Sequence, residues 1–490
     1  MKKNVLILFT FFLSACDGLI SISEPTDRIP TSVAFSTDQL ANAAMNGVYL
    51  SLLSSNGTMT KGFSCGAATL FGALSSDELT IFQGQSGSPE LFKINANHII
   101  VTGTAGSLNS PTDIAWSSAY NVIYNANAVI EGIAASKSGL LHDNVRATIT
   151  AEAQFIRAFC YFYLVNFYGD VPIVLSTRYN TEVVRSRSPQ SEVYKQIVKD
   201  LEDARAALPE DFGAAGGRRV RANKWAATAL LARVALFTGD YSAAAAMATE
   251  VIDHSSLFAL ETDLRNIFLA ASREAIWQLD QQVSNSASNA TPDGLLLVPN
   301  ARFDGTDTGY VSYNPSPQLL QAFEPGDARR RVWVDSIVDY TTHQRLYYVS
   351  KYQTGDYNDV PGGTPTELYM VLRLAEQYLV RAEAAAHNAG GGVAQAVGDL
   401  NILRRRAGLP DLPGNLTQPA LLDAVAREWQ TELFCEWGFR WFNLKRTGKA
   451  RAALSAIPLK QPWAGDHQLL YPVPPADISL SPNIKQNPGY

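Results

Sequence analysis

The feature that most constrains this chain is a stretch whose pattern is typical of two closely packed helices joined by a tight turn. It reads KWAATALLARVALFTGDYSAAAAMATEVID and spans residues 224–253. Small side chains recur in both halves, which lets the two helices approach each other, and Gly239-Asp240-Tyr241 supplies the turn. The apolar faces of such a pair cannot be buried by the pair alone, so we expect it to stack on further pairs.

Helical patterns of the same kind recur elsewhere in the chain. They occupy residues 151–172, 188–209 and 372–408, and two earlier helices are expected to begin at Ser36 and Ser110. The pair at 224–253 resembles a tetratricopeptide repeat, with Ala232 and Ala244 at the positions of close approach. We therefore predict a mainly α fold, a right-handed stack of four tetratricopeptide-like helix pairs that supports an irregular, loop-rich lobe with short strands.

Two segments interrupt the helical pattern. Residues 56–110 are rich in Gly, Ser, Thr and Asn, and residues 256–365 contain a loop rich in Gly, Asp, Asn and Pro. Within the second segment, EAIWQLD alternates as a short strand does. Long irregular segments in compact proteins are often functional, so we expect these two to form the second lobe.

The N-terminus is typical of an exported protein. Lys2 and Lys3 are followed by an apolar run from Val5 to Leu13, which is too short to cross a bilayer but suits a secretion signal. Leu13-Ser14-Ala15-Cys16 resembles a bacterial lipobox, in which the cysteine receives lipid. An ordinary signal with a chance cysteine is the alternative. We expect residues 1–15 to be a signal peptide and 16–34 to be a tether lipidated at Cys16.

Charge and cysteine usage exclude several classes of protein. Removing Lys2 and Lys3 leaves 38 of the 40 basic residues against 46 acidic ones, a balance of −8, which argues against a nucleic-acid partner. The cysteines after Cys16 are too scattered for a disulfide framework or a zinc site. The histidines, including His98, His254 and His467, lack the spacing of metal ligands.

Two short motifs suggest chemistry but have simpler interpretations. Residues 62–66, GFSCG, match the G-x-S-x-G motif of serine hydrolases, which requires a strand before Ser64 and a helix after it. A polar loop precedes the motif instead, so a hydrolase is only a weak alternative. Asp304 and Asp307 lack the further ligands of a calcium loop and are more simply part of a turn.

Charged residues cluster near the C-terminus. Arg404-Arg405-Arg406 is interpreted as a solvated helix face. In residues 428–450, three glutamates four residues apart precede a group of aromatic and basic residues. Paired carboxylates can act in acid–base catalysis. We instead predict that the acids, Glu428, Glu432 and Glu436, pair with the basic residues Arg440, Lys445 and Arg446.

Several separated blocks, in order, resemble the SusD/RagB family of surface lipoproteins. They are YLVNFYGDVPIV at 163–174, YLVRAEAAAHNAG at 378–390, LNILRRRAGLP at 400–410, FRWFNLKRTGKA at 439–450 and YPVPPADISLSPNIKQNPGY at 471–490. With the lipobox, the resemblance covers essentially the whole chain. It implies a helical SusD-like region over 35–255, a ligand-binding lobe over 256–365 and a C-terminal SusD/RagB region over 366–490.

The resemblance also implies a role. Members of this family are anchored by lipid on the outer face of the outer membrane, where they cover the opening of a SusC-type barrel. They bind oligosaccharides, or peptides in some branches, and pass them to that TonB-dependent transporter. They are not enzymes, and no cofactor or metal is expected. A tetratricopeptide scaffold that only holds envelope proteins together is a further alternative.

Ligand sites in this family are built largely from variable loops, which we place at residues 75–100 and 295–320. The candidates for stacking on sugar rings are Phe82, Phe92, Tyr310 and Tyr313. The candidates for hydrogen bonds to sugar hydroxyls are Asp77, Gln83 and Asn314. Neither loop contains tryptophan, so a peptide or a small oligosaccharide held mainly by polar groups stays an alternative.

Overall fold

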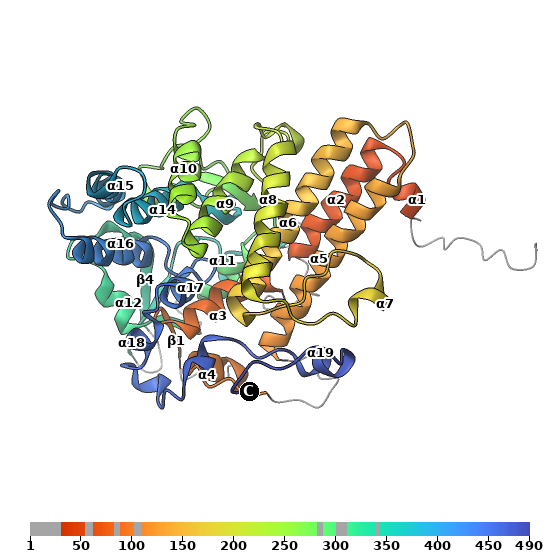
Figure 1. Cartoon of the computed structure of the whole chain (residues 1–490). Helices are drawn as coiled ribbons and strands as arrows, with labels where there is room; N and C mark the ends of the chain where they lie inside the picture. The colour runs from red at the N-terminus through yellow and green to blue at the C-terminus, as the bar shows by residue number, and fades with distance from the viewer. Residues whose placement is uncertain are drawn as a thin grey trace, which may run out of the picture.

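A row of paired helices forms the frame of the molecule (Figure 1). The structure, a computed structural model, describes residues 31–53, 62–82, 89–101, 110–281, 288–299, 311–338 and 343–490. The pairs are α2 (Asp38–Leu53) with α5 (Pro111–Ala135), α6 (Asp143–Tyr168) with α8 (Gln190–Ala207), α9 (Lys224–Thr238) with α10 (Tyr241–Ile252), and α14 (Leu374–Ala386) with α15 (Gly392–Arg406). Neighbouring pairs join through α5 and α6, α8 and α9, and α10 and α14. The predicted stack of four helix pairs is confirmed.

The third pair shows why this sequence forms a tight helical hairpin. The side chains of Asn223 and Asp240 each accept a hydrogen bond from a backbone N–H in the first turn of the helix that follows. This N–H has no acceptor within the helix, so the cap supplies one. Gly239 ends α9 with a φ of 80°, a conformation that favours glycine. Ala232 and Ala244 are fully buried. The turn and the close approach lie where the sequence predicts them.

Shorter elements surround the frame. Two helices of the C-terminal part lie beside it, α16 (Gln418–Glu432) and α17 (Phe439–Arg446). The remaining helices are α1 (Thr31–Ala34), α3 (Ala68–Ser75), α4 (Pro89–Asn95), α7 (Tyr179–Glu182), α11 (Pro292–Leu297), α12 (Pro317–Ala322), α13 (Ala328–Val332), α18 (Ala450–Leu454) and α19 (Pro475–Leu480). A π-helical turn, η1 (Phe63–Ala67), leads into α3. None of the described helices combines the length and the apolar composition that crossing a bilayer requires.

The described strands form three antiparallel pairs. They are β1 (Leu79–Ile81) with β3 (Tyr313–Pro315), β2 (Ala275–Leu279) with β6 (Tyr369–Arg373), and β4 (Val334–Val338) with β5 (Arg345–Val349). The β2–β6 pair is buried along its whole length. On β2, Trp277 packs edge-on against Phe155 and Phe159 of α6, with ring centroids 4.9 and 5.2 Å apart. The strand predicted from EAIWQLD is confirmed, and it lies at the core.

Helices α3 and α17 meet with almost no space between their backbones. A Cβ atom added at Gly72 would lie 2.3 Å from the Cα of Gly438. Gly438 itself precedes α17 with a φ of 75°. No side chain fits at this crossing, so glycine is required at position 72 for α17 to pack this closely against α3.

A buried network of ion pairs joins the irregular lobe to the last helix pair. Its centre is Glu432 at the end of α16, whose carboxylate accepts hydrogen bonds from Arg329, Arg373 and Arg406. Burial alone would raise the pKa of Glu432, but the charges of Arg406, Arg373 and Arg329 outweigh it and hold that pKa well below its ordinary value. The carboxylate therefore stays ionised inside the protein.

Two predictions about charged residues are wrong in part. The acids of residues 428–436 do pair with cations, but with cations from distant segments: Glu428 with Arg329 and Arg404, and Glu436 with Lys351 and Arg373. The basic residues that follow them have other partners, since Arg440 pairs with Asp77 and Arg446 with Glu383.

The predicted solvated face at 404–406 holds for only one of its three arginines. Arg405 is exposed and pairs with the exposed Asp411. The side chains of Arg404 and Arg406 are about 5 % exposed and turn inward to the acids of the network. The three other cysteines, Cys65, Cys160 and Cys435, are buried, and none of them forms a disulfide.

Candidate ligand-binding surface

The two segments predicted to bind ligand are joined by a short β-ladder. Strand β1 pairs antiparallel with β3, and the register places Thr80 opposite Asn314 and Ile81 opposite Tyr313. The backbone N–H of Phe82 extends the ladder by donating to the carbonyl of Ser312 at 3.0 Å. The ladder therefore fixes the described parts of the two predicted loops, residues 79–82 and 312–315, next to each other.

Phe82 is anchored on its inner side. It is half-buried and packs against a small apolar cluster formed by Val298, Val311, Leu346 and Tyr348. Two of these residues belong to β5, so the β4–β5 pair supports the ladder from below. Phe82 thus keeps part of its ring exposed while the rest is held in place.

Tyr313 and Phe92 present further aromatic surface. Tyr313 is half-buried against the main core, and burial raises the pKa of its hydroxyl, which therefore stays protonated. Phe92 stands on α4 and is 37 % exposed. Helix α4 packs on α3 and β1, so Phe92 belongs to the same end of the molecule as the ladder.

Asp77, predicted to bind hydroxyl groups, has a partner within the protein. Its carboxylate accepts two hydrogen bonds of 2.7 Å from Arg440, and the residue is 6 % exposed. In this structure Asp77 therefore serves to hold the start of β1 against α17. A direct role in ligand binding stays a prediction.

Asn314 has an unused acceptor. Its backbone lies in the ladder, whereas its side-chain oxygen Oδ1 is buried and has no hydrogen-bond partner among the described residues. A buried polar atom without a partner destabilises the fold, and such atoms often mark functional sites. Gln83, Tyr310 and Cys16 lie outside the described residues, so their predicted roles stay predictions.

The sequence did not point to the tyrosines of β5. Tyr347 is half-buried, and the guanidinium of Arg330 lies 4.7 Å from its ring centroid. Tyr348 donates a hydrogen bond to Asp335 on β4. The signal that could have found them is RLYYV, an aromatic-rich stretch typical of a strand.

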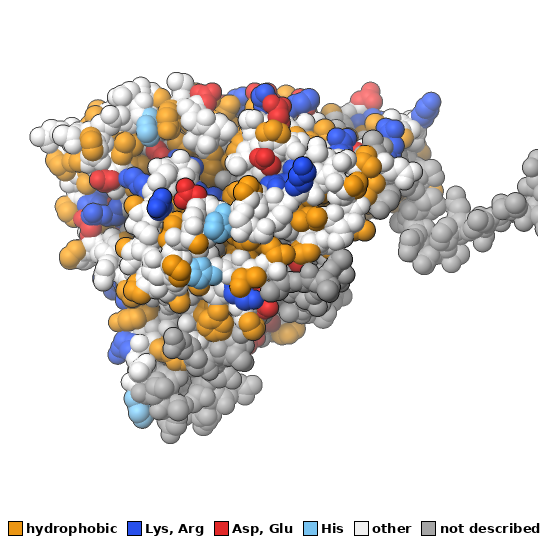
Figure 2. All heavy atoms as spheres, turned by 60° about the horizontal axis from the view of Figure 1, so that its bottom comes forward, with side chains coloured by type: hydrophobic (Ala, Val, Ile, Leu, Met, Phe, Trp, Pro, Cys, Tyr) orange, Lys and Arg blue, Asp and Glu red, His pale blue; other side chains and the backbone are white. Residues whose placement is uncertain are grey.

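We next consider the charge of the surface and the possible metal ligands. On the face that Figure 2 shows, Lys and Arg side chains alternate with Asp, Glu and hydrophobic ones, and no broad basic stripe crosses the coloured part. Within the described ranges, no group of three or more His, Cys, Asp or Glu side chains could hold a metal ion.

The serine of the G-x-S-x-G motif is a buried structural residue. Ser64 lies in η1, is 1 % exposed, and donates a 2.5 Å hydrogen bond to the carbonyl of Leu52. A nucleophilic serine needs an exposed hydroxyl at a sharp turn between a strand and a helix. The geometry of Ser64 does not offer one.

Two family models match separate parts of the chain. One, described as starch-binding associating with outer membrane (SusD-like), matches residues 90–236, and the model of the SusD family matches residues 330–490. Among curated proteins, SusD-like protein P2 of Formosa agariphila is 29% identical over 532 aligned residues that cover 100% of both chains. The starch-binding protein SusD of Bacteroides thetaiotaomicron is 24% identical, covering 69% of this chain and 72% of its own.

Solved structures share the fold. A SusD superfamily protein from Bacteroides vulgatus has a TM-score of 0.78 at 19% identity, covering 93% of this chain and 100% of its own. A laminarin binding SusD-like protein has a TM-score of 0.75 at 24% identity, with the same coverage. Surface glycan-binding protein A from Bacteroides thetaiotaomicron has a TM-score of 0.75 at 21% identity, again with that coverage.

Proposed function

Because the chain belongs to the SusD/RagB family, we propose that it is a non-catalytic surface lipoprotein that captures an oligosaccharide and delivers it to a SusC-type TonB-dependent transporter. The relatives support carbohydrate binding, since they include a starch-binding protein, a laminarin-binding protein and a surface glycan-binding protein. Delivery to a transporter rests on the family resemblance.

One observation carries the ligand proposal: the β1–β3 ladder brings together both segments that the sequence marks as ligand-binding. Phe82 and Tyr313 are each half-buried, so each ring is fixed on one side and has surface left on the other. The C–H face of a sugar ring suits such an aromatic surface. Asn314, the next residue after Tyr313 on β3, has a buried side-chain oxygen without a hydrogen-bond partner among the described residues.

The division of labour between the two parts of the molecule supports the transporter proposal. The stacked helix pairs form a broad preformed surface, which suits lasting contact with a partner protein. Binding residues in proteins often lie on loops that a rigid scaffold positions, which suits the two segments predicted to bind ligand. Lipid on Cys16 would hold the protein at the outer membrane, facing the exterior. A peptide ligand is the second candidate, because neither predicted loop contains tryptophan.

The test is calorimetry with starch-derived and laminarin-derived oligosaccharides. Replacing Phe82 and Tyr313 together by Ala should weaken binding by about 1–3 kcal/mol, the scale of lost aromatic burial, and leave co-purification of the transporter intact. The matched control is Tyr124→Ala, which removes an exposed ring from α5 of the frame. Unchanged affinity in the double variant would mean that another surface binds the sugar. Binding of peptides but of no sugar would favour the second candidate.

A further inference from the structure

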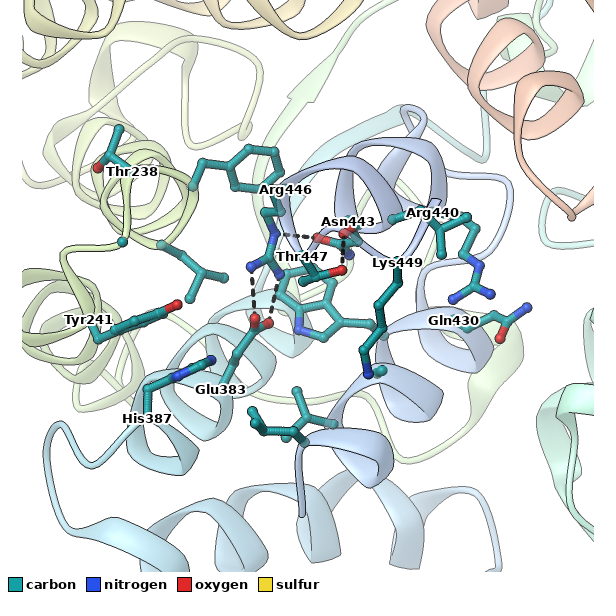
Figure 3. A pocket seen from close by; sticks show the side chains of 18 residues that line it. Thr238, Tyr241, Glu383, His387, Gln430, Arg440, Asn443, Arg446, Thr447 and Lys449 are labelled. Carbon is teal, nitrogen blue, oxygen red and sulfur yellow. Dashed lines mark hydrogen bonds and ion pairs between the residues drawn. The ribbon is translucent and has the colours of Figure 1, made fainter. Parts of the chain in front are cut away.

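A cavity lies between the frame and the C-terminal helices, apart from the β1–β3 ladder. Its volume is about 500 Å³, within the range of small-molecule sites. The turn between α9 and α10, the end of α14, and helices α16 and α17 form its walls (Figure 3). None of its lining residues belongs to β1 or β3.

Aromatic rings form part of these walls. The ring of Tyr241 stacks on that of His387, with centroids 4.0 Å apart and planes 7° from parallel. Phe237 and Trp429 also line the cavity, and the guanidinium of Arg446 lies between 5 and 6 Å from each of their rings. One face of Tyr241 and one of His387 are therefore covered by the stack, and aromatic rings contribute much of the apolar lining of the cavity.

The charged groups of the cavity already have partners. Arg446 donates two hydrogen bonds of 2.7 Å to the buried carboxylate of Glu383, as Figure 3 shows. Lys449 pairs with Asp423 at 3.0 Å, and Arg440 pairs with Asp77. An ionic ligand would therefore find no unmatched charge and would lose its own hydration without compensation.

The groups without partners are neutral. Among the described residues, the amide of Gln430, the hydroxyl of Tyr241 and the indole Nε1 of Trp429 make no hydrogen bond. Gln430 is 9 % exposed and Trp429 is 3 % exposed. Of the three groups, only Nε1 of Trp429 is fully buried without a partner, whereas Tyr241 is half-buried. Buried polar groups normally pair, and all three of these groups are neutral, so they indicate an uncharged ligand with hydroxyl or amide groups.

We propose that this cavity is a second carbohydrate site, which takes a neutral saccharide unit. A sugar ring has apolar C–H faces for the Tyr241–His387 stack and hydroxyl groups for Gln430 and Tyr241. A neighbouring hollow of about 840 Å³ shares Ala426 and Gln430 with the cavity and extends to the Gln321–Pro325 turn. The two together form a groove along α16, which lets a longer oligosaccharide continue past the first ring.

The decisive variant is Ala426→Phe. Ala426 is half-buried and lines both hollows, so a phenyl ring there fills the groove while removing no existing hydrogen bond. Ala420→Phe is the matched control, because Ala420 is exposed on the same helix and lines neither hollow. Tyr241→Phe removes one hydroxyl and keeps the ring.

The probes are maltotriose, laminaritriose and cellotriose. Their binding to the whole soluble protein is measured by calorimetry and by saturation-transfer NMR. We expect a second binding event that weakens at least about tenfold in Ala426→Phe, weakens less in Tyr241→Phe, and stays unchanged in Ala420→Phe. The second event should persist when Phe82 and Tyr313 are both replaced by Ala. If Ala426→Phe does not fold, the test is whether Gln430→Ala and Tyr241→Phe weaken the second binding event.

Three results would overturn the proposal. One is the absence of any binding event that the cavity variants change. Another is loss of all sugar binding on replacement of Phe82 and Tyr313, which would leave a single site at the ladder and the proposed function intact. The third is binding of tri-alanine in place of the sugars, abolished by Ala426→Phe, which would assign the cavity to peptide. Sugar binding that depends on the cavity alone would support this site and count against the ladder.

Discussion

The guanidinium of Arg440 donates two hydrogen bonds to the carboxylate of Asp77, from Nε and Nη2, each 2.7 Å long. Arg440 stands on α17, and Asp77 lies just before β1. The side chain of Arg440 also lines the cavity that we propose as a second carbohydrate site. One ion pair therefore connects the C-terminal helices, the ladder and the cavity.

Asp77→Asn should destabilise the fold by about 1.5–3 kcal/mol, the contribution of hydrogen bonds to a charged group, because Arg440 loses its counter-charge. Urea denaturation measures this change. Glu192→Gln is the control, since it removes one partner of an exposed ion pair on α8 and should leave the curve unchanged. Unaltered stability of Asp77→Asn with weaker oligosaccharide binding would instead restore the ligand role predicted from the sequence.

Glu432→Gln should be more damaging. It removes the charge on which Arg329, Arg373 and Arg406 converge, and loss of one partner from a buried ion pair typically costs about 3–5 kcal/mol. The melting temperature and the midpoint concentration of urea should both decrease. Arg405→Gln is the matched control, because its pair with Asp411 is exposed. Equal behaviour of the two variants would show that the network does not stabilise the fold.

These ion pairs also show where prediction from sequence reaches its limit. Helical periodicity, caps and turn glycines are local signals, so the helix pairs and the turn at Gly239 could be predicted. Partners of a buried charge are set by tertiary packing, so reasoning from neighbours four residues apart assigned Glu432 to the wrong cations. Arg404 and Arg406 were predicted to be solvated because they lie near the end of a helix, whereas the acids that they pair with come from other segments.

The candidate surface was predictable only in outline. The composition of the two irregular segments marked both as functional, and the ladder joins them. Strands β1 and β3 are too short to carry a periodic signal, so their pairing could not be predicted. The burial of Asp77 and the cavity along α16 depend on contacts between segments far apart in the chain, which no local pattern records.

Ser64→Ala should leave hydrolytic activity unchanged on nitrophenyl esters and glycosides, because the hydroxyl is buried and donates to Leu52. The expected effect is a loss of about 1 kcal/mol in stability, the value of one hydrogen bond. Ser51→Ala is the matched control, since its hydroxyl also donates to a backbone carbonyl on α2. A fall in activity by orders of magnitude in Ser64→Ala alone would revive the hydrolase hypothesis.

Cys16→Ala should release the protein from the outer membrane. A single acyl chain gives only marginal attachment, so we expect a multiply acylated cysteine at this position. The measurement is membrane fractionation followed by mass spectrometry of the N-terminal peptide. Cys65→Ala should stay with the membrane, because Cys65 is buried in η1. Unchanged retention of Cys16→Ala in the outer membrane would exclude this anchor.

Glu78, the residue after Asp77, gives the ladder a dependence on pH. Its carboxyl group is buried, accepts a hydrogen bond from the backbone N–H of Cys435 through Oε2, and has no partner for Oε1 among the described residues. Its own carbonyl accepts from the N–H of Ser316, next to β3. Burial raises the pKa of Glu78 to about 8. At neutral pH the folded protein therefore holds Glu78 mostly protonated.

The unfolded chain releases that proton near the ordinary pKa of 4.5. Between about pH 4.5 and about pH 8 the folded state binds one more proton than the unfolded state, so this group's contribution to stability is lost as pH rises, by at most about 1.4 kcal/mol per pH unit. Glu78→Gln keeps an uncharged group of similar shape and removes this dependence. Urea denaturation at several pH values should show that the free energy of unfolding of the variant rises relative to that of the wild type as pH increases from about 5 to about 8. Glu192→Gln should follow the wild type throughout. A constant difference between Glu78→Gln and the wild type would mean that Glu78 is already ionised in the folded protein, with its charge held by the ladder and α17.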